Sequence, residues 1–222
     1  MAIELVNNEF SDVAFGRTSM RVLDRDYKIP REEILQMVKE ATRAPSAVDT
    51  QPWRFVIVDT DEGKQKLESY MWEVDRGRIE NSSAAVIVLA DTGWLQDLEY
   101  VLDHYMGDAG LGSPGDPLPA GSPDRAYMLK LTTDWALGMT EHELELSVTF
   151  QAGLVTMMLM LVARAHGYDS GPMDAFDRTG MASDFGLDGD RYKVCLILAI
   201  GKALAKPVQR WRRAPEEVTT FA

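Results

Sequence analysis

The chain has 222 residues, of which 45% are hydrophobic and 26% are charged, a composition typical of a soluble globular protein. This length is enough for one sizeable hydrophobic core, so we expect residues 1–222 to form a single domain. The formal net charge of −12 argues against nucleic acid as a partner, because phosphate backbones bind to basic surfaces. Any site for a phosphorylated ligand must therefore be a local basic island.

The cysteine and histidine content limits the chemistry further. Cys195 is the only cysteine, so an intramolecular disulfide is excluded, and its apolar surroundings indicate a core residue rather than a nucleophile. His104, His142 and His166 show no metal-ligand spacing, so no metal site is predicted. The first residues lack a basic segment followed by an apolar one, so we expect no secretory signal and a cytoplasmic protein.

The first regular pattern in chain order predicts a helix that begins at Pro30 and ends at Pro45, which drives the preceding residue out of the helical region. Residues 53–59 have the composition of a strand, and residues 62–71 that of a second helix. Residues 84–90 are almost all apolar, which predicts a strand buried on both faces. The apolar stripe of the first helix is Ile34, Met37, Val38 and Ala41.

Between residues 91 and 122 the regular pattern disappears. Residues 107–123 contain five glycines and four prolines among small and acidic residues, a composition typical of loops. Long loops inside a compact domain are usually functional lids or disordered segments. We therefore expect residues 91–123 to be a variable insert or lid.

Two helices follow this segment. Residues 125–137 predict the first, and Thr140 with Glu143 forms a capping box for the second, which runs to about Ala165 and ends at Gly167. The first of these helices carries Tyr127, Leu131 and Trp135 on one side. The most apolar run of the second, residues 155–163, is too short to span a bilayer, so we expect a buried helix and no membrane.

The remaining elements complete a layered pattern. Residues 177–185 predict a short helix, residues 192–200 a third apolar strand, and residues 202–222 an extended tail. Strands separated by helices, with one very apolar central helix, indicate an α+β layered fold.

Two segments have the chemistry of a ligand site. Residues 17–21, Arg-Thr-Ser-Met-Arg, place two arginines and a serine on one side of an extended segment. Guanidinium groups bind phosphate oxygens bidentately, so this segment suits a multiply charged oxyanion. Residues 44–53, Ala-Pro-Ser-Ala-Val-Asp-Thr-Gln-Pro-Trp, form a loop stiffened by two prolines, whose small residues can present backbone N–H groups to a flat ligand.

Together these two segments resemble the N-terminal part of the nitroreductase family of flavin enzymes. The resemblance continues more weakly in residues 154–177, 198–202 and 210–218. It implies a layered α+β fold with a central mixed sheet flanked by helices, and an intertwined homodimer in which residues 202–222 pack on the partner subunit. It also implies FMN bound between two subunits, NAD(P)H as electron donor, and a nitroaromatic, quinone or similar acceptor. The implied mechanism is ping-pong, with flavin N5 carrying the chemistry and no catalytic side chain.

The resemblance also assigns roles to residues. Arg17 and Ser19, with Arg210 and Arg212 from the tail, would hold the phosphate. Arg21 stands where the family commonly has a lysine or an arginine, and a cation there favours the negatively charged reduced flavin. The implied cofactor-binding residues are Arg17, Thr18, Ser19, Arg21, Pro45, Ser46, Ala47, Asp49, Pro172, Met173, Asp174, Ala175, Arg210 and Arg212.

The isoalloxazine ring would meet two loops. Pro45, Ser46 and Asp49 fall where the family packs a loop against the cofactor, in part from the partner subunit. Backbone amides around Asp174 and Ala175 are the candidate donors to flavin N5 or O4.

Two of these positions depart from the family pattern. Asp49 replaces an asparagine, and an ionised carboxylate cannot donate a hydrogen bond. Asp49 then either caps local backbone N–H groups, alters the flavin potential or weakens FMN binding. Ala175 replaces a frequent glycine. These departures leave open a flavin-binding, storage or regulatory relative with little turnover, and residues 91–123 leave open specialised chemistry such as dehalogenation or ring oxidation.

Overall fold

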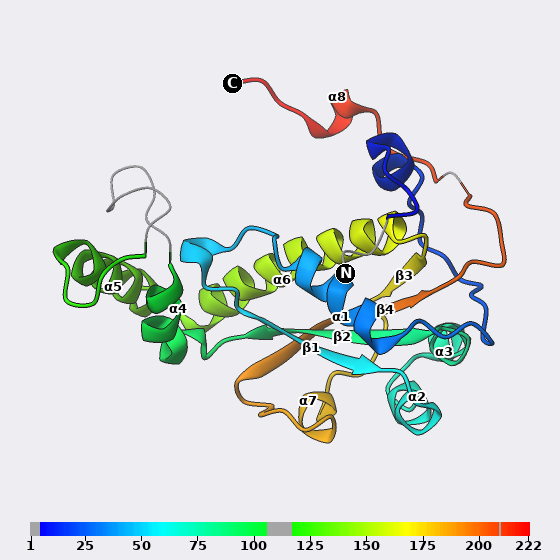
Figure 1. The fold of residues 1–222 in the computed structure, drawn as a ribbon, viewed down its shortest axis with the longest axis horizontal. Helices are drawn as coiled ribbons and strands as arrows, with labels where there is room; N and C mark the ends of the chain where they lie inside the picture. Colours follow the sequence, from blue (N-terminus) through cyan, green and yellow to red (C-terminus); the bar gives the residue numbers. More distant parts are fainter. Residues whose placement is uncertain (1–4, 106–116, 209) are drawn as a thin grey trace.

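The computed structural model describes residues 5–105, 117–208 and 210–222, and in them one sheet lies between two layers of helices (Figure 1). In sheet order, the strands are β1 (Trp53–Val58), β2 (Ala84–Asp91), β4 (Tyr192–Gly201) and β3 (Asp169–Met173). One face is covered by α1 (Arg31–Ala41) and α6 (Glu141–Ala165). The other face is covered by α2 (Asp61–Glu68), α3 (Glu73–Glu80) and α7 (Met181–Asp184).

Strand β2 joins the two halves of the core. Val86 and Val88 pack among the residues of α1 and α6, while Ile87 and Leu89 pack among those of α2, α3 and α7. Every residue of β2 is buried, since successive side chains point to opposite faces and both faces are covered. The prediction of a strand buried on both sides is confirmed.

The α+β layered fold is confirmed, but the described sheet is antiparallel rather than mixed. All three strand pairs are antiparallel, and among residues 5–105, 117–208 and 210–222 parallel pairing is limited to an isolated bridge between Ser19 and Ser170. The mixed sheet was what the family resemblance implied. Here α2 and α3 instead return the chain to the end where β1 finished, so that Val58 pairs with Ala85 and β2 runs back along β1.

Helix α6 begins and ends as the sequence predicts. Thr140 Oγ1 accepts from Glu143 N at 3.2 Å and Glu143 Oε2 accepts from Thr140 N at 2.8 Å, so the capping box is formed. Gly167, with φ of 80°, follows the last turn. By length and composition α6 is the one described helix that could cross a membrane, but in this fold it packs against α1 and the sheet.

Several elements differ from the sequence prediction. Strand β3 forms within a segment predicted as a loop. The sequence does not predict this strand because Gly171 and Pro172 interrupt the strand pattern. A short turn, Trp94–Asp97, and α4 (Leu98–His104) form inside the predicted lid. Helix α7 covers only part of the predicted residues 177–185. Most of the glycine-rich part of the predicted lid lies outside the described residues.

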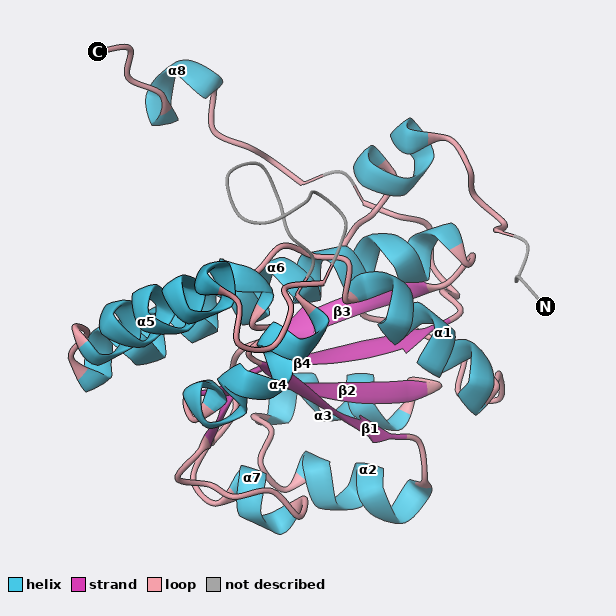
Figure 2. Cartoon of the chain, turned by 60° about the vertical axis from the view of Figure 1, so that its left-hand side comes forward, coloured by secondary structure: helices cyan, strands magenta, loops and turns pink. Residues whose placement is uncertain are grey.

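Helix α5 (Pro123–Leu137) projects with α4 beyond the N-terminal end of α6 (Figures 1 and 2). Its predicted apolar side is exposed in the single chain, where Tyr127, Leu131 and Trp135 all face outward. The helix instead buries Met128 and Ala136.

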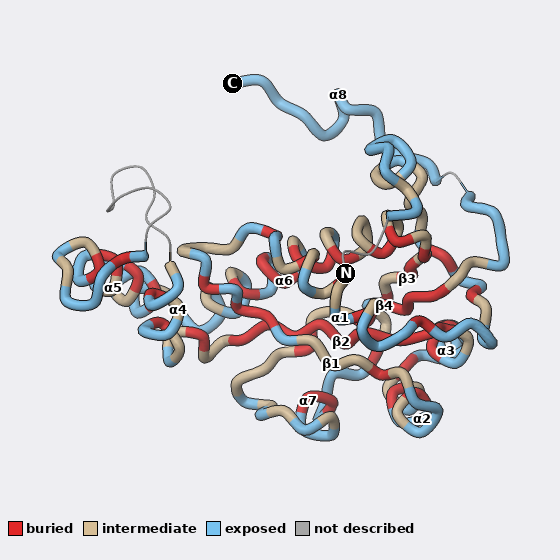
Figure 3. The backbone as a smooth tube through the Cα atoms, viewed as in Figure 1, coloured by how far each residue is buried: buried red, intermediate tan, exposed pale blue. Residues whose placement is uncertain are grey.

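The C-terminal tail leaves the body of the chain. After Gly201 almost every described residue is exposed, including those of the short helix α8 (Pro215–Val218), as Figure 3 shows in pale blue. At the C-terminal end of α6 the chain instead meets its own N-terminal turn, Ser11–Phe15.

Candidate functional site

The basic segment 17–21 lies along strand β3. Met20 N donates to Ser170 O at 2.9 Å, and Ser19 forms a parallel bridge with Ser170. A Cβ on Gly171 would lie 2.4 Å from Met20 O, so only glycine permits this close approach. Met20 is buried, whereas Ser19 and Arg21 are exposed. The extended backbone therefore presents the polar side chains of this segment on its outer side, as the sequence predicts.

Within the part of the chain that the structure describes, one side-chain atom of segment 17–21 and one of β3 are buried without a hydrogen-bond partner. They are Arg17 Nε and, on β3, Ser170 Oγ. Buried donors are normally hydrogen-bonded, because leaving one unsatisfied costs about 1–3 kcal/mol. Thr18 differs, since its hydroxyl lies 3.3 Å from Met20 Sδ. Arg17 and Ser170 therefore have hydrogen-bonding capacity for an oxygen-rich ligand.

A second arginine cluster contains a residue that the sequence reasoning missed. Arg78, on α3, is 8% exposed, and its Nε lies 3.2 Å from Asp75 Oδ1 without hydrogen-bond geometry. Burial lowers the pKa of Arg78; the charge of Asp75 opposes this, and the charge of Arg21 lowers the pKa further. The positive charges of Arg21 and Arg78 therefore act on one another, and the negative charge of Asp75 opposes them. Helix α3 is short and highly charged, and its sequence has no apolar periodicity from which the burial of Arg78 could be predicted.

Residues 172–175 lie at the end of β3, the strand along which segment 17–21 runs. Pro172 and Met173 belong to the strand, and Ala175 O accepts from Trp72 N at 3.4 Å. Asp174 pairs with Arg178, which also stacks on Phe176. The Asp174 carboxylate is therefore held by a neighbouring cation.

A pocket of about 420 Å³ adjoins Asp174 between α6 and the start of β4. Cys195 lines it and is only partly buried, so the prediction of a core cysteine needs correction. Its Sγ lies 3.9 Å from Thr149 Oγ1, and burial raises the pKa of the thiol. A raised pKa keeps the sulfur protonated, so a nucleophilic role is not supported.

The loop of residues 45–51 has an unusual backbone. Val48, Asp49 and Gln51 have φ of 53°, 51° and 47°, in the left-handed region that non-glycine residues rarely adopt. Such residues cost about 1–3 kcal/mol each and persist where their surroundings fix them. Ser46 Oγ accepts from Gln51 N at 3.0 Å, and Ala47 N donates to Gln151 Oε1 at 2.8 Å.

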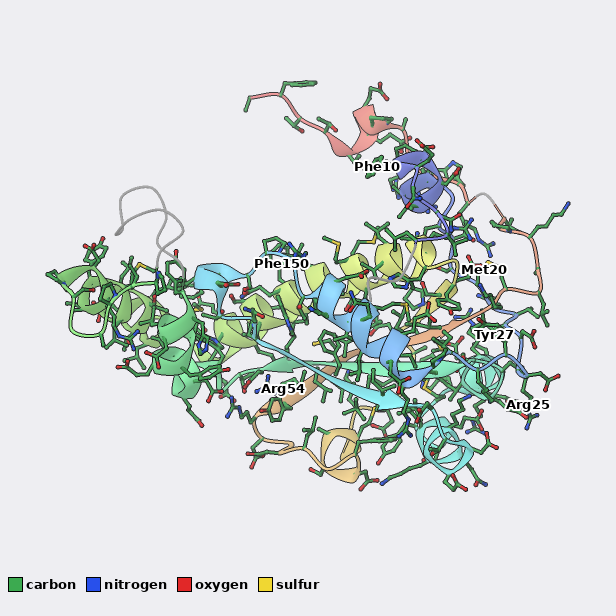
Figure 4. All side chains as sticks on the ribbon, viewed as in Figure 1. Phe10, Met20, Arg25, Tyr27, Arg54 and Phe150 are labelled. Atoms are coloured by element: carbon green, nitrogen blue, oxygen red, sulfur yellow. The ribbon has the colours of Figure 1, made fainter. Side chains whose placement is uncertain are left out.

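Within one chain the two candidate segments meet α6 at well-separated positions. Gln151 holds the loop near the N-terminal half of the helix, whereas Arg164 lies beside residues 16–17 at the C-terminal end, 3.5 Å from where a Cβ on Gly16 would be. The helix rises 1.5 Å per residue, so these anchor points are roughly 20 Å apart along its axis. Figure 4 labels Met20, in the segment 17–21, and Phe150, which precedes Gln151 in α6.

The tail arginines are not brought to either segment. Arg210 and Arg212 are exposed, and Arg212 Nη1 donates to the adjacent Trp211 O at 2.9 Å. Figure 2 shows the tail running away from the N-terminal turn. Among the described residues no group of three or more His, Cys, Asp or Glu is arranged to hold a metal ion.

Three comparisons with known proteins bear on this arrangement. The family model described as "Nitroreductase family" matches residues 14–99 and 132–202. YdgI of Bacillus subtilis, whose name assigns it to the NAD(P)H nitroreductases, is 37% identical over 196 residues, covering 88% of this chain and 89% of that protein. The "CLA biosynthesis enone reductase" of Lactiplantibacillus plantarum is 34% identical over 225 residues, covering 98% of this chain and 96% of that protein.

A solved structure agrees with these matches. The crystal structure of a nitroreductase from Exiguobacterium sibiricum in complex with FMN superimposes with a TM-score of 0.86 at 31% identity, covering 97% of this chain and 98% of that one. Family model, relatives and fold therefore coincide over most of the sequence, and the chain belongs to the nitroreductase family.

Proposed function

We propose that this protein is an FMN-dependent oxidoreductase that takes electrons from NAD(P)H and passes them to nitroaromatic, quinone or similar acceptors by a ping-pong mechanism. The observation that carries the proposal is the buried Arg17 Nε, which has no hydrogen-bond partner among the described residues, in a segment that also presents Ser19 and Arg21. The relatives named as NAD(P)H nitroreductases and the FMN complex of a structural neighbour support it.

The residues of this chain fit FMN. Arg17 and Ser19 supply charge-assisted and hydroxyl hydrogen bonds suited to the phosphate. Arg21, beside the buried Arg78, provides positive charge suited to the N1 and O2 edge of the ring. Residues 172–175, at the end of β3, follow the contact of Met20 with Ser170, and we propose the backbone amides around Asp174 and Ala175 as donors to the ring.

FMN, when bound, supplies the hydride-carrying atom of the reaction. The chain's own residues then have three tasks: holding the phosphate, stabilising negative charge and orienting the ring. We assign no side chain as a catalytic acid or base. We propose that the protein acts in the cytoplasm, where nicotinamide donors are available.

We further propose that the active form is a homodimer in which the site is completed by both subunits. The loop of residues 45–51 and the chain beside Arg17 meet α6 at residues roughly 20 Å apart along its axis, so we propose that each loop serves the site of the other subunit. Helix α6 also leaves Leu146, Phe150 and Met157 exposed, with Phe150 67% exposed. A second copy would cover this apolar face and bring its own loop to the first subunit's Arg17.

The tail and the predicted lid have roles in this dimer. We propose that residues 202–222 pack on the partner subunit, because Trp211, Val218 and Phe221 are exposed in the single chain. Arg210 and Arg212 would reach the phosphate only in that arrangement. We propose residues 91–123 as the part that selects the acceptor. Its first residue, Asp91, forms a bidentate contact at 2.6 and 2.7 Å with Arg191, which immediately precedes β4.

An enone is a second candidate acceptor. The relative named as an enone reductase matches this chain over nearly its full length. Reduction of an α,β-unsaturated carbonyl adds a hydride to the β-carbon and a proton to the α-carbon, so it uses the same electron donor and the same site.

An absorbance experiment tests the proposal. The purified protein reconstituted with FMN should lose its visible flavin absorbance after anaerobic addition of NADPH or NADH. Absorbance should return on addition of menadione, a nitroaromatic or a simple enone, and the fastest recovery identifies the preferred class. Flavin that stays oxidised with both nicotinamides would contradict an enzymatic role and favour a flavin-storage protein.

A further inference from the structure

We propose that Gln151 is a positioning residue that holds the cofactor loop, residues 45–51, in the conformation in which it meets the flavin. This inference deepens the proposed function and rests on it. Gln151 is 5% exposed and lies on the buried side of α6 among Val148, Ala152 and Val155. A carboxamide is out of place in this apolar stripe unless its hydrogen bonds have a purpose.

The hydrogen bonds of Gln151 fix the orientation of its amide. Its Nε2 lies 3.2 Å from Ser147 O and 3.3 Å from Ser147 Oγ, one turn earlier in α6. A backbone carbonyl can only accept, so the amide nitrogen must face Ser147. The oxygen then faces the loop and accepts from Ala47 N at 2.8 Å. Gln151 therefore connects a rigid helix to the loop backbone.

The loop needs such a connection because its backbone is strained. Val48, Asp49 and Gln51 all have positive φ, and Val48 is β-branched, for which this region is least favourable. Two side-chain hydrogen bonds lie inside the loop. Ser46 Oγ accepts from Gln51 N, and Thr50 Oγ1 donates to Ala47 O. These bonds shape the loop, and the bond from Gln151 fixes it relative to the helix. Strained backbone is typical of functional sites where the surroundings hold it in place.

Loss of this bond should act on one part of the flavin only. In the proposed dimer the loop meets a flavin whose phosphate is held by the other subunit, whereas the hydrogen bonds of Gln151 are to Ser147 and Ala47 of its own chain. Removing the Gln151 acceptor should release the loop and its contact with the ring, while the phosphate contacts remain. FMN should then bind more weakly, and the visible spectrum of the bound flavin should move towards that of free FMN.

Four variants test this inference. Gln151→Met keeps the side-chain length but cannot hydrogen-bond, and Gln151→Asn keeps the amide but is too short to reach Ala47. Gln151→Glu retains an acceptor for Ala47 N. The matched control is Thr156→Val, on the same buried side of α6. The Thr156 hydroxyl donates to Ala152 O at 2.6 Å within the helix and does not contact the loop.

The measurements are the FMN dissociation constant by fluorescence titration and the spectrum of bound FMN. We expect Gln151→Met and Gln151→Asn to weaken binding by about ten-fold, equivalent to about 1.4 kcal/mol. The Gln151→Glu variant should bind FMN with close to wild-type affinity. The Thr156→Val variant should have lower thermal stability but an unchanged FMN dissociation constant. If the Gln151→Met variant does not fold, the FMN affinity and spectrum of the Gln151→Asn variant decide the test.

The outcomes separate this inference from the proposed function. Wild-type FMN affinity and spectrum in the folded Met or Asn variant would overturn the role of Gln151 alone. An equal loss of affinity in Thr156→Val would also overturn it, because the effect would then be general destabilisation of α6. A wild-type protein that binds no FMN would overturn the proposed function, and this inference with it.

Discussion

Arg21 and Arg78 lie close enough for their charges to interact, although they come from segments far apart in the sequence. Burial lowers the pKa of Arg78, and the nearby charge of Arg21 adds to this effect against the opposing charge of Asp75. Two guanidinium groups and one carboxylate leave a positive balance at this point of an acidic protein. A ligand group that gains negative charge is stabilised there.

Removing one of these cations should change the flavin potential. Arg21→Gln should lower the midpoint potential of bound FMN, because the reduced flavin loses a stabilising positive charge. A change of 30 mV corresponds to about 1.4 kcal/mol in a two-electron couple, a reasonable size for one exposed charge. Redox titration measures it. Arg25→Gln is the control, since Arg25 pairs with Glu80 at 2.5 Å. Equal potentials in all three proteins would remove Arg21 from the site.

Arg17 should contribute to affinity rather than to potential. Arg17→Ala should weaken FMN binding by about ten-fold to more than a hundred-fold, since hydrogen bonds to charged groups contribute about 1.5–3 kcal/mol each. Fluorescence titration of FMN into Arg17→Ala and the control Arg25→Ala measures the effect. Unchanged affinity would show that Arg17 does not hold the phosphate.

Asp49 tests the main departure from the family pattern. Its φ is 51° and its Oδ1 lies 3.3 Å from Gln51 Nε2. Asparagine adopts the left-handed region readily, so Asp49→Asn should keep the loop conformation. Loss of the negative charge should raise the midpoint potential and speed reduction by NAD(P)H. A potential that does not change, with stability altered by about 1 kcal/mol or less, would restrict Asp49 to capping the loop.

A polar cluster of buried His166 and partly exposed Glu33 and Glu40 links α1 to the end of α6 and gives a pH-dependent stability. His166 Nε2 lies 2.9 Å from Glu40 Oε2, and its Nδ1 lies 3.3 Å from Glu33 Oε1. Burial favours the neutral form of Glu40, but hydrogen bonds from Gln36 and His166 outweigh it and lower the pKa below its usual 4.5. Because the pKa of Glu40 is lower in the folded state, ionised Glu40 stabilises the fold at pH values above the unfolded-state pKa. This stabilisation is lost as the pH falls through the folded-state pKa.

Glu40→Gln should therefore destabilise the protein most at neutral pH. We expect a loss of about 1 kcal/mol at pH 7, with the difference from wild type shrinking as the pH falls below the usual carboxyl value. Urea unfolding at several pH values measures it, with Glu32→Gln on the same helix as the control. A difference that is constant or grows towards acid pH would contradict the assigned role of Glu40.

Much of this fold could be predicted from the sequence because its signals are local. Thr140 and Glu143 marked the start of α6, and the unbroken apolar run of β2 marked a strand buried on both faces. Strand β3 could not be predicted, since Gly171 is required there by the approach of Met20 O and carries no strand propensity. The antiparallel sheet could not be predicted either, because strand direction depends on where α2 and α3 return the chain.

The candidate site likewise contains residues that local sequence patterns predict and residues that they do not. The segments 17–21 and 44–53 were recognisable because their side chains carry the chemistry in sequence. Arg78 and Gln151 were not, because each acts through a contact with a distant segment: Arg78 with Arg21, and Gln151 with Ala47. Their importance follows from the three-dimensional arrangement and from burial, which local patterns do not report.

The most direct test of the account is FMN binding by a mixed dimer. Arg17→Ala should disable the phosphate end of the site and Ala47→Trp should obstruct the loop end, so each variant alone should bind FMN weakly. Two differently tagged chains, each carrying one change, are co-expressed and the heterodimer is isolated. If each site combines Arg17 of one subunit with the loop of the other, one site escapes both changes, and the heterodimer should bind one FMN with wild-type affinity. A heterodimer with no tight site would show that both ends belong to a single chain and would contradict the account.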